Sequence, residues 1–288
     1  SSLPRRAIVS AMSVELTRTV RFCVNPPGAR DRAGASNGYG GKPAMAGFGR
    51  YYELRVHCAG DPDPRTGYLV NIKDIDAAAR AAAVPLIENA CDERPTTEPA
   101  AILPEILPAV DEKLGGIVVG VTLSLTPTYS VSAEKHDMHL VTIRQRFDFA
   151  ASHRLHAPEL SDEENRRVFG KCNNPSGHGH NYQVEPAVTV ELADDGTPAL
   201  SLHQLEEIVD RAVVERYDHT YLNADTEEFN PDIGVNPSVE HIARVCFERL
   251  APAIRETSAG RASLTSVTVW ETDRTSSTYA APEPAAAS

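Results

Sequence analysis

The sequence lacks the features of a membrane, secreted or nucleic-acid-binding protein. None of its 288 residues belongs to a run approaching the ~18 apolar residues of a membrane-spanning helix. Its five cysteines form no CxxC pair and are odd in number, which favours reduced thiols over a disulfide framework. The net charge of −12 argues against nucleic acid as the main partner. We therefore expect a cytoplasmic protein with neither a membrane nor a nucleic acid as its partner.

The two ends of the chain carry little information. Arg5 and Arg6 precede an apolar run that is too short for the core of a signal peptide. Two interpretations fit this stretch: Met12 is the natural start, or residues 1–11 are a leader without fixed structure. Residues 281–288, rich in alanine and proline, have nothing to pack against and are expected to be disordered.

Three histidines give the strongest local signal for a metal. His178 and His180 lie within FGKCNNPSGHGHNYQ (169–183), and residues two apart on a strand face the same way. A second strand-like run, FDFAASH (147–153), ends with His153 on its apolar face. Three imidazoles from two adjacent strands leave a fourth position open, as in a catalytic zinc site. The alternative is that these histidines only form hydrogen bonds within a sheet.

Cys172 lies in the loop that precedes the paired histidines. The loop consists of Cys, Asn, Asn, Pro and Ser, a composition atypical of core filler. Gly177 and Gly179 flank His178 and allow close approach of the backbone. A small buried hydrophobic residue, the usual state of a free cysteine, is the alternative for Cys172.

The chain contains an internal repeat. The segment GYGGKPAMAGFGRYYE (38–53) aligns without gaps on the histidine segment, placing Gly47 on Gly177 and Gly49 on Gly179. Two later segments match in the same order with slowly growing offsets: 95–98 on 237–240, and 121–126 on 266–271. This pattern indicates a duplication. We expect one domain over 12–132 and a second over 138–280.

Each half is predicted to be α+β, an antiparallel sheet with two helices on one face. In the second half, strands are expected at 147–151, 182–192 and 267–270. Ser201 and Gln204 form a capping box that opens the first helix, and the second helix begins near Ser238. Pro186 predicts an edge strand or a bulge. Ser152, just before His153, predicts a second bulge.

Five segments of the second half occur in an order shared with a known family. They are FAASHRL (149–155), FGKCNNPSGHGHNY (169–182), YDHTYLN (217–223), NPSVEHIA (236–243) and WET (270–272). Together they resemble the 6-pyruvoyl-tetrahydropterin synthases, whose relatives include the 6-carboxy-tetrahydropterin synthases. The resemblance implies two tandem tunnelling-fold (T-fold) domains in a homo-oligomeric barrel. A trimer of such fused pairs would replace a hexamer.

The resemblance also implies a reaction. A carbon–oxygen lyase holding Zn²⁺ on His153, His178 and His180 would convert 7,8-dihydroneopterin triphosphate by proton abstraction, side-chain rearrangement and loss of triphosphate. Cys172 would be the base, with its pKa lowered by a nearby cation and histidine.

Asp218 and His219 would relay the proton of the thiol, by analogy across a subunit or domain boundary. The alternative for this pair is an Asp–His cap on a turn. Glu271 would anchor the pterin ring through two parallel N–H bonds, unless it is only an exposed acid at a strand end. Ser238 and Glu240 are further candidates for pterin binding, although Ser238 acts first as a helix N-cap and Glu240 favours the helix dipole.

The first half keeps the glycines but loses the candidate catalytic groups. In the alignment, the replacements are Phe48 for His178, Arg50 for His180, Lys42 for Cys172, Glu88-Asn89 for Asp218-His219, and Thr126 for Glu271. We interpret this half as a structural or regulatory domain without catalytic groups that fills partner positions in the barrel. Arg50 and Lys42 are either an anion-binding pair or solvated or ion-paired charges.

Two rival functions stay open at this point. A 6-carboxy-tetrahydropterin synthase would take the same substrate to another product, but the loop from Cys172 to His178 favours the pyruvoyl branch. A zinc- and pterin-binding module without turnover is the rival from a different class. Retention of Cys172, Asp218 and His219 together argues against it, because binding alone would not need them.

Overall fold

The computed structural model describes residues 14–32 and 40–281. The expectations for the leader and for 282–288 of the tail fall outside the described residues. The chain divides into two compact units: unit 1 comprises 1–141 with 194–197, and unit 2 comprises 142–193 with 198–288. Within the described ranges, no helix combines the length and apolar character needed to span a membrane.

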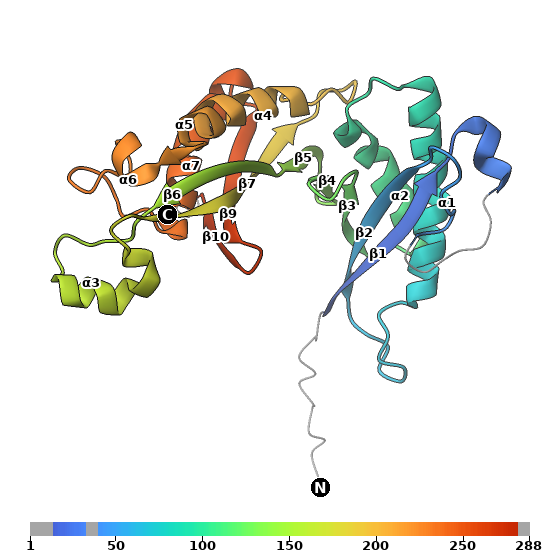
Figure 1. Cartoon of the computed structure of the whole chain (residues 1–288). Helices are drawn as coiled ribbons and strands as arrows, with labels where there is room; N and C mark the ends of the chain where they lie inside the picture. Colours follow the sequence, from blue (N-terminus) through green and yellow to red (C-terminus); the bar gives the residue numbers. More distant parts are fainter. Residues whose placement is uncertain (1–13, 33–39, 282–288) are drawn as a thin grey trace, which may run out of the picture. The chain divides into compact units, whose positions relative to one another are not determined.

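Unit 1 is an antiparallel sheet with two long helices (Figure 1). Its elements are β1 (Val14–Val24), η1 (Pro27–Arg32), β2 (Arg50–Gly60), α1 (Ile72–Glu93), η2 (Pro99–Ile102), α2 (Leu103–Lys113), β3 (Val118–Ser124) and β4 (Tyr129–Glu134). The strands are ordered β1-β2-β3-β4. Helices α1 and α2 pack against each other, and they contact β1 and β3 respectively. The unit is therefore α+β, as expected.

Unit 2 repeats this arrangement with additional short elements (Figure 1). Its strands are β5 (Asp137–Gln145, which begins in unit 1), β6 (Phe147–His153), β7 (His178–Glu191), β8 (Thr220–Tyr221), β9 (Ala262–Thr272) and β10 (Thr275–Ala280). Its helices are α3 (Asp162–Phe169), η3 (Gly170–Asn173), α4 (Leu202–Val209), η4 (Asp210–Val214), α5 (Glu215–Tyr217), α6 (Leu222–Asp225) and α7 (Val239–Thr257). Strand β7 pairs with β5 and β6 and also with β9, and β8 runs parallel to β6. Helix α7 packs on β9 and β10, and α4 packs on α7.

Local sequence signals account for where the helices begin. The capping box of Ser201 and Gln204 opens α4, as predicted, and the hydroxyl of Ser238 caps α7. A second capping box, Ser161 with Glu164, opens α3 and was not anticipated from the sequence. Helix α3 is followed directly by η3, which contains Cys172.

The two units share strand order and aromatic packing. Phe22 on β1 stacks on Tyr52 of β2, and Phe149 on β6 stacks on Tyr182 of β7, with ring centroids 5.9 and 5.1 Å apart. In each unit, the phenylalanine lies directly opposite the tyrosine in an antiparallel pair. The strands β1, β2, β3 and β4 of unit 1 correspond, in this order, to β6, β7, β9 and β10 of unit 2.

The register of β3 corrects one step of the sequence alignment. Glu53 pairs with Ser124 in unit 1, as Gln183 pairs with Trp270 in unit 2. The residue that follows Ser124 is Leu125, so Leu125 and not Thr126 corresponds to Glu271. The sequence alignment was wrong by one residue at this strand. The register is set by hydrogen bonds between strands, and these cannot be read from the sequence.

The two predicted irregularities near the histidines have different outcomes. Pro186 lies in an interior strand, so the edge alternative is wrong, and the register shift at Ala187/Val188 confirms the bulge alternative. Ser152 causes no bulge, because Ser152 pairs with Gly179 and His153 with His178 in unbroken register. The side chain of His153 therefore points in the direction expected for a regular strand.

Candidate metal centre

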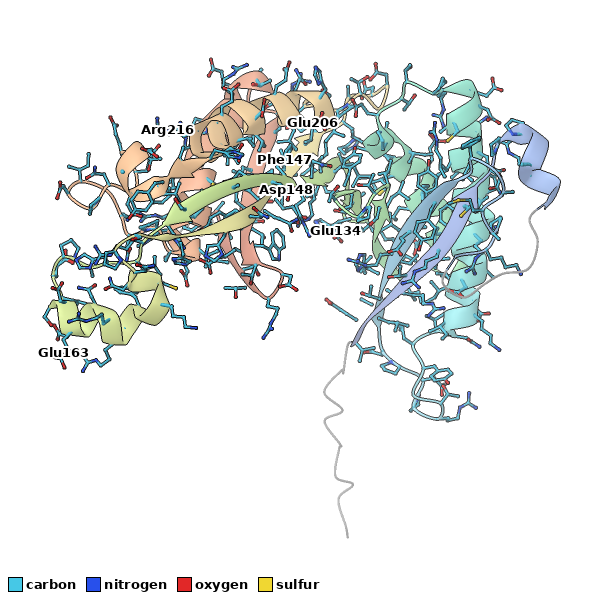
Figure 2. All side chains as sticks on the ribbon, in the orientation of Figure 1. Glu134, Phe147, Asp148, Glu163, Glu206 and Arg216 are labelled. Carbon is cyan, nitrogen blue, oxygen red and sulfur yellow. The ribbon has the colours of Figure 1, made fainter. Side chains whose placement is uncertain are left out.

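Antiparallel pairing of β6 and β7 brings the three predicted histidines together. His153 pairs directly with His178, and His180 lies two residues further on the same face. Their face is the apolar one, shared with Phe149 and Tyr182, both buried. Figure 2 draws the side chains, with Phe147 and Asp148 labelled where β6 begins.

Glu271 of β9 joins the histidines in what we call the His–Glu cluster (His153, His178, His180 and Glu271). One ligand atom from each of the four residues lies within 4.8 Å of all the others. The Nε2 atom of His153 is 3.2 Å from Nε2 of His178 and 3.3 Å from Oε1 of Glu271. Nε2 of His180 is 3.4 Å from the same carboxylate oxygen. A tetrahedral zinc with ligands at about 2.0–2.1 Å places its ligand atoms about 3.3–3.4 Å apart, so the spacing fits a metal ion.

A hydrogen bond sets the orientation of His153. Its side chain is fully buried, and Nδ1 lies 2.7 Å from the carbonyl oxygen of Pro237. A carbonyl only accepts, so Nδ1 carries a proton and Nε2 faces the cluster, where its lone pair would be available to a metal ion. Such a carbonyl partner is typical of histidines that bind metals. Sequence analysis missed Pro237, because backbone acceptors leave no residue-type signal.

The electrostatics of the cluster also favour a cation. Burial lowers the pKa of His178 and of His180, and the neighbouring histidines lower it further, so both are neutral at neutral pH. The bond to His153 and the nearby imidazoles lower the pKa of Glu271, which is ionised. Nδ1 of His178 and Nε2 of His180 are buried and have no hydrogen-bond partner in the described part of the chain. Neutral imidazoles, one carboxylate and unsatisfied nitrogens are a set that could hold a divalent metal ion.

Cys172 is held beside the cluster by backbone contacts. The N–H of Leu155, just beyond β6, donates to the carbonyl of Cys172 at 2.8 Å, and the amide of Asn173 donates to the carbonyl of Leu155 at 2.7 Å. Burial raises the pKa of the Cys172 thiol, and the charge of Glu271 raises it further. The protein groups alone therefore raise the pKa of this thiol, and its lowering by a nearby cation stays a prediction.

Asp218 and His219 lie at the edge of the sheet. One carboxylate oxygen of Asp218 accepts from the N–H of Ala150 and the other lies 2.7 Å from Nδ1 of His219. These two hydrogen bonds lower the pKa of Asp218. The side chain of His219 is 82% exposed. Among the described residues, no hydrogen bond or ion pair joins this pair to Cys172.

The surroundings of His219 lie mainly on the other face of the sheet. His219 lines a cavity of 660 Å³ together with Ser152, Asn181 and one member of the cluster, His180. The side chains of Ser152 and Asn181 alternate with those of His153 and His180 along their strands, so they point away from the His–Glu cluster. Within one chain, the Asp–His pair therefore adjoins mainly residues whose side chains point away from the cluster.

The two remaining candidates serve the start of α7. The hydroxyl of Ser238 accepts from the N–H of His241, and Glu240 lies in the first turn. In the described part of the chain, neither contacts the His–Glu cluster through a hydrogen bond or ion pair. The structure thus brings together His153, His178, His180 and Glu271, with Cys172 nearby.

Gly177 has a conformation and surroundings that exclude a side chain. Its φ of 69° is left-handed, and an added Cβ would lie 2.9 Å from a ring carbon of Tyr221 and 3.1 Å from the carbonyl oxygen of His153. We expect Gly177→Ala to destabilise the protein by about 1–3 kcal/mol and to displace His178, weakening metal binding. Metal content and chemical denaturation would measure both effects.

Gly170 offers a matched control for this substitution. It also has a positive φ, 55°, but an added Cβ would meet no atom within 4 Å. Gly170→Ala should therefore cost stability without loss of metal. Equal metal content in the two variants would contradict the role of Gly177 in placing His178.

The second half of the chain is similar to proteins of one known family. The family model "6-pyruvoyl tetrahydropterin synthase" matches residues 142–282. The 6-pyruvoyl tetrahydrobiopterin synthase of Drosophila melanogaster is 45% identical over 30% of this chain, which spans only 52% of that relative. The human protein of the same name is 39% identical over 34% of this chain and 67% of its own. The solved structure of the Caenorhabditis elegans 6-pyruvoyl tetrahydropterin synthase is 33% identical, covers 50% of this chain and 96% of its own, and has a TM-score of 0.45. On its sequence, this chain belongs to the 6-pyruvoyl tetrahydropterin synthase family.

Proposed function

We propose that the chain is a zinc-dependent lyase of the 6-pyruvoyl tetrahydropterin synthase type, which converts 7,8-dihydroneopterin triphosphate with loss of triphosphate. The observation that carries the proposal is the convergence of three imidazole nitrogens and Glu271 beside Cys172. The matches to the family model and to relatives support the same substrate class.

Zinc is the metal that this ligand set suits best. Three histidine nitrogens that converge on one point are typical of catalytic zinc, which keeps one position for water or substrate. His153, His178 and His180 would hold the ion. When bound, zinc would polarise the side-chain oxygens of the substrate and acidify the adjacent C–H bond. In this proposal, Cys172 would take the proton from that carbon.

Asp218 and His219 have the geometry of a proton relay that another subunit could use. The carboxylate fixes the imidazole through Nδ1, so Nε2 of His219 faces solvent with its lone pair or proton free to exchange. Because no hydrogen bond or ion pair joins this pair to Cys172 among the described residues, we propose that they meet across a subunit or domain boundary.

The assembly follows from the same family likeness. We propose two tandem T-fold domains, 12–132 and 138–280, of which only the second is catalytic, in a cytoplasmic homo-oligomer. The shared strand order and the equivalent Phe–Tyr pairs support the duplication. Light scattering that finds a monomer would exclude the trimer and the relay across chains.

The test of the proposed function is a product assay. Zinc-loaded protein is incubated with dihydroneopterin triphosphate, and the products are identified by mass spectrometry. A pyruvoyl pterin with free triphosphate would confirm the proposal. A carboxy-pterin with loss of a two-carbon fragment would assign the chain to the rival branch, and absence of product with zinc bound would leave a binding module.

Glu271 has two possible roles that one substitution separates. As a pterin anchor it would accept two N–H bonds, whereas its position 3.3 Å from Nε2 of His153 also suits a metal ligand. We expect Glu271→Gln to lower pterin affinity about 10- to 100-fold and to leave zinc bound, because a carboxamide accepts one of the two bonds only. If metal analysis showed that the variant had lost zinc, Glu271 would instead be a metal ligand.

A further inference from the structure

Unit 1 has a cavity at the position that corresponds to the His–Glu cluster of unit 2. Arg50 precedes Tyr52 by two residues, as His180 precedes Tyr182, and the two tyrosines pair with equivalent phenylalanines. Leu125, at the position of Glu271, lines the same cavity. The cavity has a volume of about 140 Å³, and we call it the Arg–Cys cavity after Arg50, Arg94 and Cys91 in its wall.

The charge of Arg50 is not matched by an acid. Its Nη1 lies 3.8 Å from the sulfur of Cys91, and the hydroxyl of Tyr52 lies 3.9 Å from the same sulfur. Burial raises the pKa of Tyr52 to about 12, so its hydroxyl is a neutral donor at neutral pH. Among the described residues, no carboxylate forms an ion pair with Arg50.

Arg94 brings a second guanidinium to the wall. Its Nη1 pairs with Glu105 at 2.9 Å, while its Nε is buried without a hydrogen-bond partner. A buried donor without a partner is uncommon in folded proteins and points to an absent acceptor. Glu98 also lines the cavity, and no ion pair joins it to Arg50 among the described residues.

The rest of the wall is apolar. Ile87, Ile102, Leu123 and Leu125 line the cavity, and Ile102 and Leu123 are buried. A cavity of about 150 Å³ can hold one benzene ring. We propose that the Arg–Cys cavity binds a small organic carboxylate, with its carboxylate on Arg50 and Arg94 and a compact apolar body against these side chains.

Benzoate is a suitable probe because benzamide has the same shape without the charge. Isothermal titration of the intact protein with millimolar benzoate should give saturable binding, whereas benzamide should bind at least about tenfold more weakly. Arg50→Gln and Arg94→Gln should each weaken benzoate about 10- to 100-fold. Glu98→Gln should strengthen it, because a like charge is removed.

Arg65→Gln is the matched control in the same unit, since Arg65 is 87% exposed and pairs only with Asp63 among the described residues. It should leave benzoate binding unchanged, and thermal unfolding would verify that each variant is folded. Absence of benzoate binding, equal binding of benzamide, or an Arg50→Gln variant that binds as the wild type does would overturn the proposal. Phosphate binding in place of benzoate, with the same dependence on Arg50, would overturn the assignment to carboxylates.

Discussion

Cys172→Ala is expected to lower kcat about 10²- to 10⁴-fold, the usual contribution of a positioned general base. The thiol lies beside the His–Glu cluster, held there by backbone contacts that do not involve its sulfur. Alanine should therefore remove the proton acceptor without disturbing the loop. Zinc content and pterin affinity should stay close to those of the wild type, so the loss should appear in kcat with little change in KM.

Ser176→Ala is the control for the loop itself. Ser176 is exposed, and within the described residues its one hydrogen bond is donated by its backbone N–H to the side-chain oxygen of Asn174. This variant should keep full activity. If Cys172→Ala retains turnover while zinc stays bound, the base lies elsewhere. If it has lost zinc as well, Cys172 supports the metal and the kinetic assignment fails.

His180→Ala is expected to abolish both tight metal binding and activity. Loss of an outer-shell partner of a metal ligand already costs about 10- to 100-fold in affinity, and loss of a ligand should cost more. A metal that binds only the folded state stabilises it, by about 2.7 kcal/mol when the free metal concentration is 100 times the dissociation constant. The variant should lose this stabilisation. Metal analysis, activity and thermal unfolding with and without a chelator measure the three effects.

A histidine remote from the cluster provides the comparison. The side chain of His203 is 77% exposed, and its ion-pair partner is Glu207, one turn along α4. His203→Ala should keep its metal, and chelation should lower its unfolding temperature as it does that of the wild type. If His180→Ala bound one zinc per chain with unchanged affinity, the His–Glu cluster would not be the metal site.

The candidate metal ligands could be predicted from the sequence because the signals for them are local. Alternation along a strand places His178 and His180 on one face, and the apolar residues of β6 place His153 on the matching face. Helix starts at Ser201 and Ser238 were readable for the same reason, since a cap and its first turn are contiguous.

Features that depend on distant pairing could not be read in this way. The approach of Glu271 to the histidines depends on how β9 pairs with β7, including the bulge beside Pro186. A shift of one residue would turn its carboxylate to the opposite face. The slip between Thr126 and Leu125 arose from the same cause in unit 1. The raised thiol pKa of Cys172 likewise reflects burial and a carboxylate far away in the sequence.

Residue type and short-range periodicity thus specified the α+β class, the three histidines and the cysteine beside them. Packing in three dimensions placed Glu271 in the cluster, placed Asp218 and His219 at the edge of the sheet, and joined Arg50 with Arg94 around one cavity. The difference is physical, because strand alternation and helix caps act within a few residues. Strand register, burial and the field of neighbouring charges exist only when segments far apart in the chain come into contact.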